Sequence, residues 1–295
     1  MKQVIQKADI LVEALPYIQR FRGQTVVVKL GGSSLDNEQA MHGILQDIAF
    51  MECVGLRPVL IHGGGKAINV RLQKKNVQPH FLKGLRVTDA DTLRVVERVL
   101  NQEVNPELVN MLRSFGCKAH GIHGEDIITA EKRVQMDEET KQMLDWGFVG
   151  NVLAVDVEPI AAYLNSDVIP VITPLGADEK RQLYNINADI AAAAIAEKLQ
   201  ARKLVFLSDV PGLLSDPADR TSVMSTLRFS EVEELIRRGV IASGMLPKIG
   251  GALKAIRAGV RKVHIIDAAL PHSLLLELFT AEGVGTEIIN DIAGN

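Results

Sequence analysis

Aromatic residues are scarce in this sequence of 295 residues, and their scarcity limits the kind of core that the chain can build. Phe, Trp and Tyr together make up 4% of the residues, whereas apolar residues of all kinds make up 47%. The core must therefore be aliphatic, as expected of buried parallel strands covered by helices. The length allows one large domain or two lobes around a sizeable core.

The sequence also lacks an excess of positive charge. Its formal net charge is −3, which argues against a general nucleic-acid binder, because such proteins usually present a basic face. An anionic substrate is still compatible with this charge. A few placed lysines and backbone amides are enough to bind a phosphate group locally.

Cysteine is nearly absent, and long apolar runs are absent. Cys53 and Cys117 belong to no CxxC motif or Cys/His cluster; two reduced thiols in a cytosolic protein are the favoured interpretation, with a disulfide or redox role as the alternative. The N-terminus shows no secretory signal pattern, and no apolar run reaches the roughly 18–20 residues that span a bilayer. We therefore expect a cytoplasmic protein.

Apolar strand-like runs alternate with helix-like stretches along the chain, which predicts an α/β fold with a mostly parallel sheet. The residues from 126 to 152 are more polar and indicate short antiparallel strands or a lid. The predicted strands cover residues 25–29, 58–62, 167–172, 203–207 and 262–266, and the predicted helices cover residues 92–115, 189–199 and 230–238.

Two features suggest how the chain is divided. Apolar residues recur at helical spacing over residues 8–21, and Pro16 should kink or break that helix; the segment packs either on its own domain or on a neighbouring subunit. No Pro/Gly/Ser linker separates two bodies. We expect two lobes in one unit, with a boundary near residues 176–182.

Two glycine turns follow two of the predicted strands, Lys29-Leu-Gly-Gly-Ser-Ser and His62-Gly-Gly-Gly-Lys. Parallel sheets bind ligands at the carboxyl ends of their strands, glycine lets the backbone approach an anion closely, and a helix that follows adds N–H donors and a positive dipole end. Neither turn matches the Walker A or the Rossmann pattern, but together they predict a phosphate site.

Six motifs in order along the chain carry a resemblance to a known family. They are Lys29-Leu-Gly-Gly, His62-Gly-Gly-Gly, Gly84-Leu-Arg-Val-Thr-Asp, Asn185-Ile-Asn-Ala-Asp, Leu207-Ser-Asp-Val-Pro-Gly and Gly244-Met-Leu-Pro-Lys. The sequence resembles the amino acid kinase family, and within it the arginine-sensitive branch that phosphorylates N-acetyl-L-glutamate.

The resemblance implies a three-layer αβα sandwich with a mostly parallel central sheet. It further implies a kinked helix over residues 1–22 for oligomerisation, a lobe over 23–178 that binds N-acetyl-L-glutamate and dimerises, and a lobe over 179–295 that binds ATP with Mg²⁺. The product would be an acyl phosphate on the side-chain carboxylate, the second step of arginine biosynthesis.

Such a reaction needs no general base, because a carboxylate with a solution pKa near ~4.3 is already ionised at neutral pH. This fits a sequence without a Ser/His/Asp or Cys/His arrangement. What the enzyme must supply is positioning and positive charge. By resemblance, Lys29 would stabilise the transferring phosphoryl group, Lys248 the leaving side of ATP, and Asp189 would hold both. Taken alone, each lysine could be a solvated surface cation, and Asp189 a favourable acid in the first turn of a helix.

The resemblance also implies the groups that bind the acceptor. Arg86 has the fork geometry to take the α-carboxylate of N-acetyl-L-glutamate with two hydrogen bonds. Asn185 would bind the backbone carboxylate or amide of the substrate. Gly64 and Gly65 would offer backbone amides to the substrate and the γ-phosphate.

On the nucleotide side, the resemblance assigns Gly31, Gly32, Asp209 and Gly212 to ATP. The alternative for Asp209 is a turn-forming acid before Pro-Gly. No protein cluster for the metal is expected, because Mg²⁺ often binds through nucleotide phosphates and water.

An arginine-inhibited enzyme is implied by Tyr17, His264, Glu277 and Gly283, with Glu277 as the carboxylate partner of a guanidinium. In that branch the N-terminal helix interlaces dimers into a hexamer. The alternative is an ordinary strand histidine and a solvated helix glutamate. Asp267-Ala268 departs from the usual Asp-Gly of the family near this site, and His123-Gly-Glu-Asp departs from the usual Ser-Gly-Lys-Asp.

Two other functions stay open. The fold could serve another carboxylate or carbamate acceptor, such as aspartate, glutamate or carbamate, or a nucleoside monophosphate or carrier-bound aminoadipate. Alternatively, the chain could be a non-catalytic sensor of arginine or nucleotide. A Rossmann dehydrogenase is disfavoured because the fingerprint fails.

Overall fold

An eight-stranded sheet forms the centre of the molecule in the computed structural model, which describes residues 2–31, 35, 37–137, 140–216, 218–241, 245–280 and 283–291. The strand order is β12-β14-β13-β11-β1-β2-β8-β5, and neighbours are parallel except for β13 with β14. The strands are β1 (Thr25–Leu30), β2 (Arg57–His62), β5 (Ala119–Ile122), β8 (Ile169–Ile172), β11 (Lys203–Ser208), β12 (Thr226–Arg228), β13 (Lys262–Asp267) and β14 (Thr286–Ile289).

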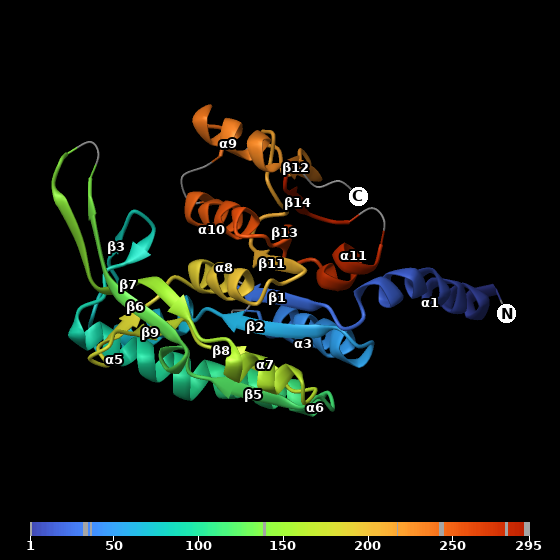
Figure 1. The fold of residues 1–295 in the computed structure, drawn as a ribbon, viewed down its shortest axis with the longest axis horizontal. Helices are drawn as coiled ribbons and strands as arrows, with labels where there is room; N and C mark the ends of the chain where they lie inside the picture. The colour runs from blue at the N-terminus through green and yellow to red at the C-terminus, as the bar shows by residue number, and fades with distance from the viewer. Residues whose placement is uncertain are drawn as a thin grey trace.

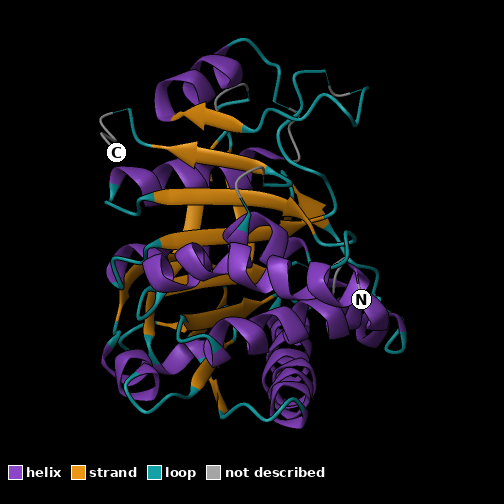
Figure 2. Cartoon of the chain, turned by 90° about the vertical axis from the view of Figure 1, so that its right-hand side faces the viewer, coloured by secondary structure: helices purple, strands orange, loops and turns teal. Residues whose placement is uncertain are grey.

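Helices cover both faces of this sheet (Figures 1 and 2). Successive side chains of a strand point to opposite faces, so Val27 packs into one apolar core and its neighbours Val26 and Val28 into the other. The first core receives side chains from α7 (Glu158–Leu164), α8 (Ala188–Lys198), α9 (Phe229–Arg237) and α10 (Leu246–Arg257), and the second from α3 (Glu38–Cys53), α4 (Gly65–Gln73), α5 (Ala90–Arg98), α6 (Asn105–Ser114) and α11 (Ser273–Phe279). The three-layer αβα architecture expected from the sequence is confirmed.

The stretch predicted as one helix over residues 92–115 is divided, because a π-helical turn, η1 (Val99–Val104), lies between α5 and α6. The N–H of Asn105 bonds to the carbonyl of Leu100, five residues back. Pro106 follows at the start of α6 and has no N–H of its own to donate. π-turns of this kind are frequent at functional sites, and this one packs Leu100 against the second glycine turn.

A smaller sheet closes on itself beside the main one, in the order β10-β7-β6-β9. Its long antiparallel hairpin projects from the body of the molecule (Figure 1). The short antiparallel strands expected in residues 126–152 are therefore present, but they are longer than predicted. The predicted lobe boundary falls in the turn between β9 and β10. The strands are β6 (Ile128–Met136), β7 (Met143–Val155), β9 (Leu175–Ala177) and β10 (Leu183–Asn185); a separate two-stranded hairpin is β3 (Phe81–Leu82) with β4 (Leu85–Arg86).

The N-terminal helix, α1 (Lys2–Phe21), is a single helix of 20 residues that contains Pro16. It begins earlier than the apolar periodicity over residues 8–21 indicated, lies within the range 1–22 that the resemblance implied, and does not break at the proline. The carbonyl four residues back belongs to Val12, which is exposed, so water can replace the hydrogen bond that the proline removes. The helix extends away from the body of the molecule (Figure 1). None of the helices in the described residues has the length and apolar character needed to cross a membrane.

Candidate functional site

Two lysines meet one aspartate at the carboxyl ends of the central strands. Lys29 lies near the end of β1, and its Nζ is 2.9 Å from Oδ1 of Asp189 in the first turn of α8. Lys248, in the first turn of α10, places its Nζ 3.4 Å from each carboxylate oxygen of Asp189. The side chain of Asn187 caps α8 by accepting from the N–H of Asp189, which fixes the start of the helix and with it the carboxylate.

Charge is unbalanced in this cluster, because two cations share one anion. Burial opposes ionisation of Asp189, but the ammonium groups of Lys29 and Lys248 hold its pKa below the ordinary value. Burial lowers the pKa of Lys248, repulsion by Lys29 adds to that effect, and Asp189 opposes it. The three groups carry a net positive charge in a partly desolvated place, where an anionic ligand is favoured.

Gly31, in the first glycine turn, lets the backbone at the end of β1 pack closely against that of β11. A Cβ on Gly31 would lie 2.7 Å from the carbonyl oxygen of Leu207 and 3.4 Å from Nζ of Lys29. A side chain at this position would therefore push apart two strands and crowd the ammonium group. Gly32, predicted to bind ATP, lies outside the described residues.

The second glycine turn forms the start of α4, with Gly64 as its N-cap residue. A Cβ on Gly64 would lie 2.7 Å from Cδ2 of Leu100, so a side chain at this position would displace Leu100 of the π-turn. Within the described part of the chain, the backbone N–H groups of Gly64 and Gly65 have no acceptor. Free N–H donors at the positive end of a helix suit an anion.

A pocket of about 200 Å³ opens beside this turn and is lined by several of the predicted acceptor residues. Gly64, Gly65, Arg86 and Asn185 all contribute to its wall. Apolar residues that sequence reasoning did not assign to the site complete it. They are Ile68, Phe81, Leu85, Leu100, Val149 and Ile186; their sequence pattern is that of ordinary core residues, so no signal distinguished them.

Arg86 is held with part of its guanidinium free. Its Nη2 donates to the carbonyl of Gly65 at 3.1 Å, and the group lies 4.8 Å from the ring centre of Phe81. Its Nη1 is buried and has no acceptor among the residues that the structure describes. Burial lowers the pKa of Arg86, yet a guanidinium stays charged in proteins. A carboxylate ligand would satisfy the free donor.

Asn185 lines the pocket, and the buried Thr88 lies behind it. The Asn185 amide Nδ2 donates to Oγ1 of Thr88 at 3.2 Å, and that hydroxyl donates to the carbonyl of Arg86 at 2.9 Å. This chain of hydrogen bonds couples the strand that carries Arg86 to the strand that carries Asn185.

The predicted nucleotide residues lie at the end of β11. Asp209 faces Lys248 closely enough to favour its charged form, and its backbone carbonyl is 3.4 Å from Nη2 of Arg220. A Cβ on Gly212 would lie 2.5 Å from Oγ1 of Thr286, so this glycine is required for close packing of the turn. Within the described ranges, no group of three or more His, Cys, Asp or Glu side chains could hold a metal ion.

The four residues predicted to bind arginine lie together at a second hollow. Tyr17, Glu277 and Gly283 line a cavity of about 430 Å³ beside α1 and α11. His264 lies behind Glu277, with Nδ1 2.6 Å from Oε1. Oε2 of Glu277 accepts from the N–H of Val284 at 2.7 Å. Glu277 is only 8% exposed, so the alternative of a solvated helix glutamate is wrong.

This second hollow carries charges of both signs. Lys203 and Lys262 line it together with Glu277 and Glu287, and Nζ of Lys262 is 2.7 Å from Oε2 of Glu287. Burial, reinforced by Lys262, lowers the pKa of Lys203 to about 8. Sequence reasoning missed both lysines, although each is a charged residue at the start of an otherwise apolar strand.

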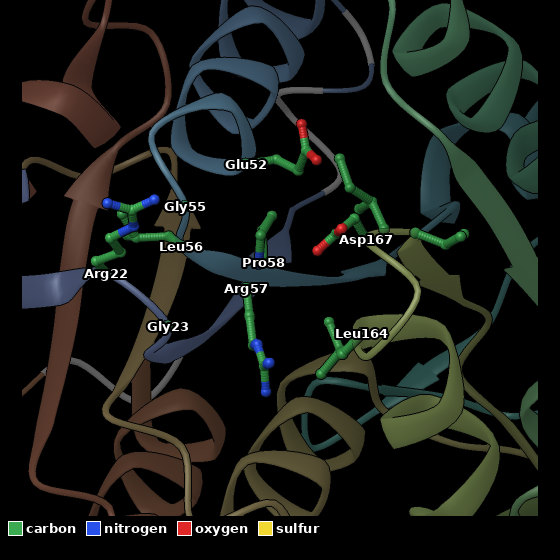
Figure 3. A pocket seen from close by; sticks show the side chains of 11 residues that line it. Arg22, Gly23, Glu52, Gly55, Leu56, Arg57, Pro58, Leu164 and Asp167 are labelled. Carbon is green, nitrogen blue, oxygen red and sulfur yellow. The ribbon is translucent and has the colours of Figure 1, made fainter.

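A third hollow lies at the amino ends of the strands, on the opposite edge of the sheet from the glycine turns (Figure 3). It has a volume of about 260 Å³. Arg22, Glu52, Arg57 and Asp167 contribute its charged side chains. None of the predicted site residues lines it.

Comparison with known proteins gives consistent results over nearly the whole chain. Residues 24–267 match the amino acid kinase family. The chain is 45% identical over 294 residues to an acetylglutamate kinase of Heliobacterium modesticaldum, covering 98% of this chain and 100% of that protein. It is 46% identical over 287 residues to an acetylglutamate kinase of Syntrophomonas wolfei, covering 97% of this chain and 98% of that protein.

A solved structure is similar as well. It is N-acetylglutamate synthase from Neisseria gonorrhoeae, complexed with coenzyme A and N-acetyl-glutamate, with a TM-score of 0.84 and 29% sequence identity. The similarity covers 97% of this chain and 64% of that chain. The present chain therefore corresponds to about two thirds of the synthase and to the full length of the two kinases.

Proposed function

The chain belongs to the amino acid kinase family, and from that premise we propose that it transfers the γ-phosphoryl group of ATP to the side-chain carboxylate of N-acetyl-L-glutamate. The product is an acyl phosphate, formed in the second step of arginine biosynthesis. The observation that carries the proposal is the pair Lys29 and Lys248 on one carboxylate, next to a pocket with a free guanidinium donor. Full-length similarity to acetylglutamate kinases supports the choice of acceptor.

The pocket suits an acceptor that has one carboxylate to be anchored and another to react. Arg86 offers its free Nη1 to the α-carboxylate, while Asn185 supplies a polar amide group to the same pocket. The apolar wall around Leu100 and Ile186 suits the methyl of an acetyl group. Anchoring in this way leaves the side-chain carboxylate directed to the glycine turn and the lysines.

The chemical step is electrostatic. The attacking carboxylate is ionised at neutral pH, so no residue has to remove a proton. Lys29 offsets the charge of the transferring phosphoryl group, and Lys248 that of the leaving phosphate. The free N–H groups of Gly64 and Gly65 add fixed donors, which cost no reorganisation when charge develops.

Magnesium fits this arrangement through the nucleotide. Asp189 is occupied by two ammonium groups, which leaves Asp209 as the nearby acid that could contact a hydrated ion. Mg²⁺ commonly keeps several waters and binds substrate phosphates, and when bound it neutralises charge on those phosphates. We propose Mg²⁺ with ATP in that role.

We further propose that L-arginine inhibits the enzyme from the hollow beside α1. Its two acids complement the guanidinium and the ammonium of such a ligand, and its cations Arg20, Lys203 and Lys262 complement the carboxylate. Exposed apolar side chains on the projecting α1, Ile5, Val12 and Leu15, favour contact with a second copy of the chain, consistent with a dimer or hexamer. A cytoplasmic location stays a prediction.

One assay tests the reaction and its acceptor. ATP consumption is measured with N-acetyl-L-glutamate, L-glutamate, L-aspartate or carbamate, and hydroxylamine traps any acyl phosphate as a hydroxamate. We expect turnover and hydroxamate with N-acetyl-L-glutamate. Turnover with a different acceptor alone refutes the substrate, and no turnover with any acceptor supports the non-catalytic sensor instead.

A further inference from the structure

We propose that Asn105 and His62 form a hydrogen-bonded relay that aims the N–H of Gly64 into the acceptor pocket. Both would then be positioning residues for the phosphoryl transfer, acting through the backbone of the glycine turn. The inference rests on the proposed function, since it assigns the Gly64 N–H a role in that reaction. The relay consists of Val171 on β8, Asn105 on α6, His62 on β2 and the Gly63–Gly64 peptide.

The orientation of the Asn105 amide follows from its two partners. Its Nδ2 is 2.9 Å from the carbonyl oxygen of Val171 and 3.1 Å from Nε2 of His62. A backbone carbonyl can only accept, so the group that faces Val171 must be the NH₂. Its second hydrogen is then directed to His62.

The orientation of Asn105 in turn selects the tautomer of His62. An amide NH₂ cannot accept, so Nε2 of His62 must carry the lone pair and Nδ1 the proton. Nδ1 lies 2.8 Å from the carbonyl oxygen of Gly63, which accepts from it. His62 is fully buried, and burial lowers its pKa to about 4. The ring is therefore neutral near pH 7 and donates in one fixed direction.

The last step of the relay is the planarity of the peptide bond. The carbonyl of Gly63 and the N–H of Gly64 belong to one trans peptide unit and point in opposite directions. When His62 holds the carbonyl, the N–H is directed away from the ring. Three consecutive glycines offer little steric resistance to rotation of this unit, so the hydrogen bond from His62 selects its orientation.

Two neighbouring features make room for the relay. A Cβ on Gly121 of β5 would lie 2.1 Å from Oδ1 of Asn105, so the glycine leaves the space that the amide occupies. Asn105 follows the π-turn η1 directly and is buried. An α-helical continuation would change the angle at which its side chain leaves the helix, because the π-turn inserts an extra residue.

Substitution of His62 separates positioning from general stability. His62→Asn keeps an amide donor near the place of Nδ1, whereas His62→Leu removes the donor at similar volume. His42, an exposed histidine on α3, provides matched controls as His42→Asn and His42→Leu. Turnover with N-acetyl-L-glutamate, KM for that substrate and melting temperature are measured for all four variants.

The expected result is a fall in kcat of about 10²-fold for His62→Leu, the usual loss for one fixed donor, with KM nearly unchanged. His62→Asn should recover about tenfold of that loss, part of the donor's worth, and both controls should match the wild type. Equal turnover in His62→Leu and His62→Asn overturns the relay, whether both are active or both are inactive with unchanged melting temperatures.

The tautomer itself is measured in the unaltered protein by NMR of ¹⁵N-labelled histidine, with the His62 signals identified by their loss in His62→Asn. Protonated Nδ1 and unprotonated Nε2 are expected, and Asn105→Asp should move the proton to Nε2 or add a second one. A wild-type protein that phosphorylates N-acetyl-L-glutamate but carries the proton on Nε2 refutes the relay alone. A wild-type protein with the expected tautomer and no turnover refutes the proposed function.

Discussion

Asp189 should be indispensable because it offsets the repulsion between two close ammonium groups. Lys29 and Lys248 both lie within 3.4 Å of its Oδ1. At an effective dielectric constant of about 20, two like charges that contact the same oxygen repel by about 3 kcal/mol or more. In Asp189→Asn this repulsion is no longer compensated. Loss of the carboxylate should therefore lower the pKa of Lys248 further.

The fall should affect Lys248 most, because burial and Lys29 already lower its pKa and Asp189 opposes them. We therefore expect kcat of Asp189→Asn to fall by about 10²-fold or more at neutral pH. It should fall further as the pH rises, because Lys248 then loses its charge. The measurement is a pH profile of kcat from pH 6 to 9, alongside the wild type.

A matched control tests the alternative role of Asp189 as an acid that stabilises a helix terminus. Asp91 occupies the first turn of α5 and is exposed. Asp91→Asn should leave kcat and its pH profile unchanged. If Asp189→Asn also keeps wild-type turnover and the same pH profile, the shared-carboxylate argument is refuted.

Four further predictions follow from the two sites and from the buried histidine. Lys29→Ala and Lys248→Ala should each lower kcat by at least about 10²-fold; near-wild-type turnover in either removes that lysine from the mechanism. Arg86→Lys should raise KM for N-acetyl-L-glutamate about tenfold and change kcat less, because the forked contact is lost; an unchanged KM contradicts the role of Arg86 as the carboxylate anchor. Millimolar L-arginine should raise the apparent KM of the wild type but not of Glu277→Gln; equal inhibition of both places the effector elsewhere. Burial lowers the pKa of His62 from 6.5 to about 4. Between pH 4 and pH 6.5, His62 is therefore protonated in the unfolded chain but not in the folded chain. The free energy of unfolding should therefore fall by up to about 3 kcal/mol as the pH decreases from 6.5 to 4; urea unfolding of His62→Asn should lack this contribution, and an identical pH dependence in both contradicts it.

The central strands could be predicted from the sequence because continuous apolar runs are typical of strands buried on both faces. The run over residues 203–207 is observed as Lys203–Ser208, and that over 262–266 as Lys262–Asp267. The division of residues 92–115 by the π-turn η1 was missed, because the apolar pattern was taken to indicate one continuous helix. Pro106 was the signal, since it lacks the N–H of a continuous helix.

The cluster of Lys29, Lys248 and Asp189 could be predicted from motifs but not from the spacing of these residues along the chain. Lys29 and Asp189 are 160 residues apart, and nothing local in the sequence shows that β1 and β11 are neighbours in the sheet. The parallel pairing of these strands brings the first glycine turn beside the ends of α8 and α10. The buried state of Glu277 was missed for a similar reason, because its partners, His264 and Val284, come from other elements.

The charge imbalance at Asp189 bears on whether the chain is a catalyst or a sensor. Lys29 and Lys248 repel each other across one shared carboxylate, and Asp189 with the nearby Asp209 offsets that repulsion only in part. An anion placed between Lys29 and Lys248 offsets the remaining repulsion, so the site is built for a ligand with several negative charges. The proposed arginine hollow differs because it offers two acids, Glu277 and Glu287, beside the cations Arg20, Lys203 and Lys262. A protein that only sensed arginine would need the hollow beside α1 and not the cluster of Lys29, Lys248 and Asp189. The presence of both sites favours an arginine-regulated kinase.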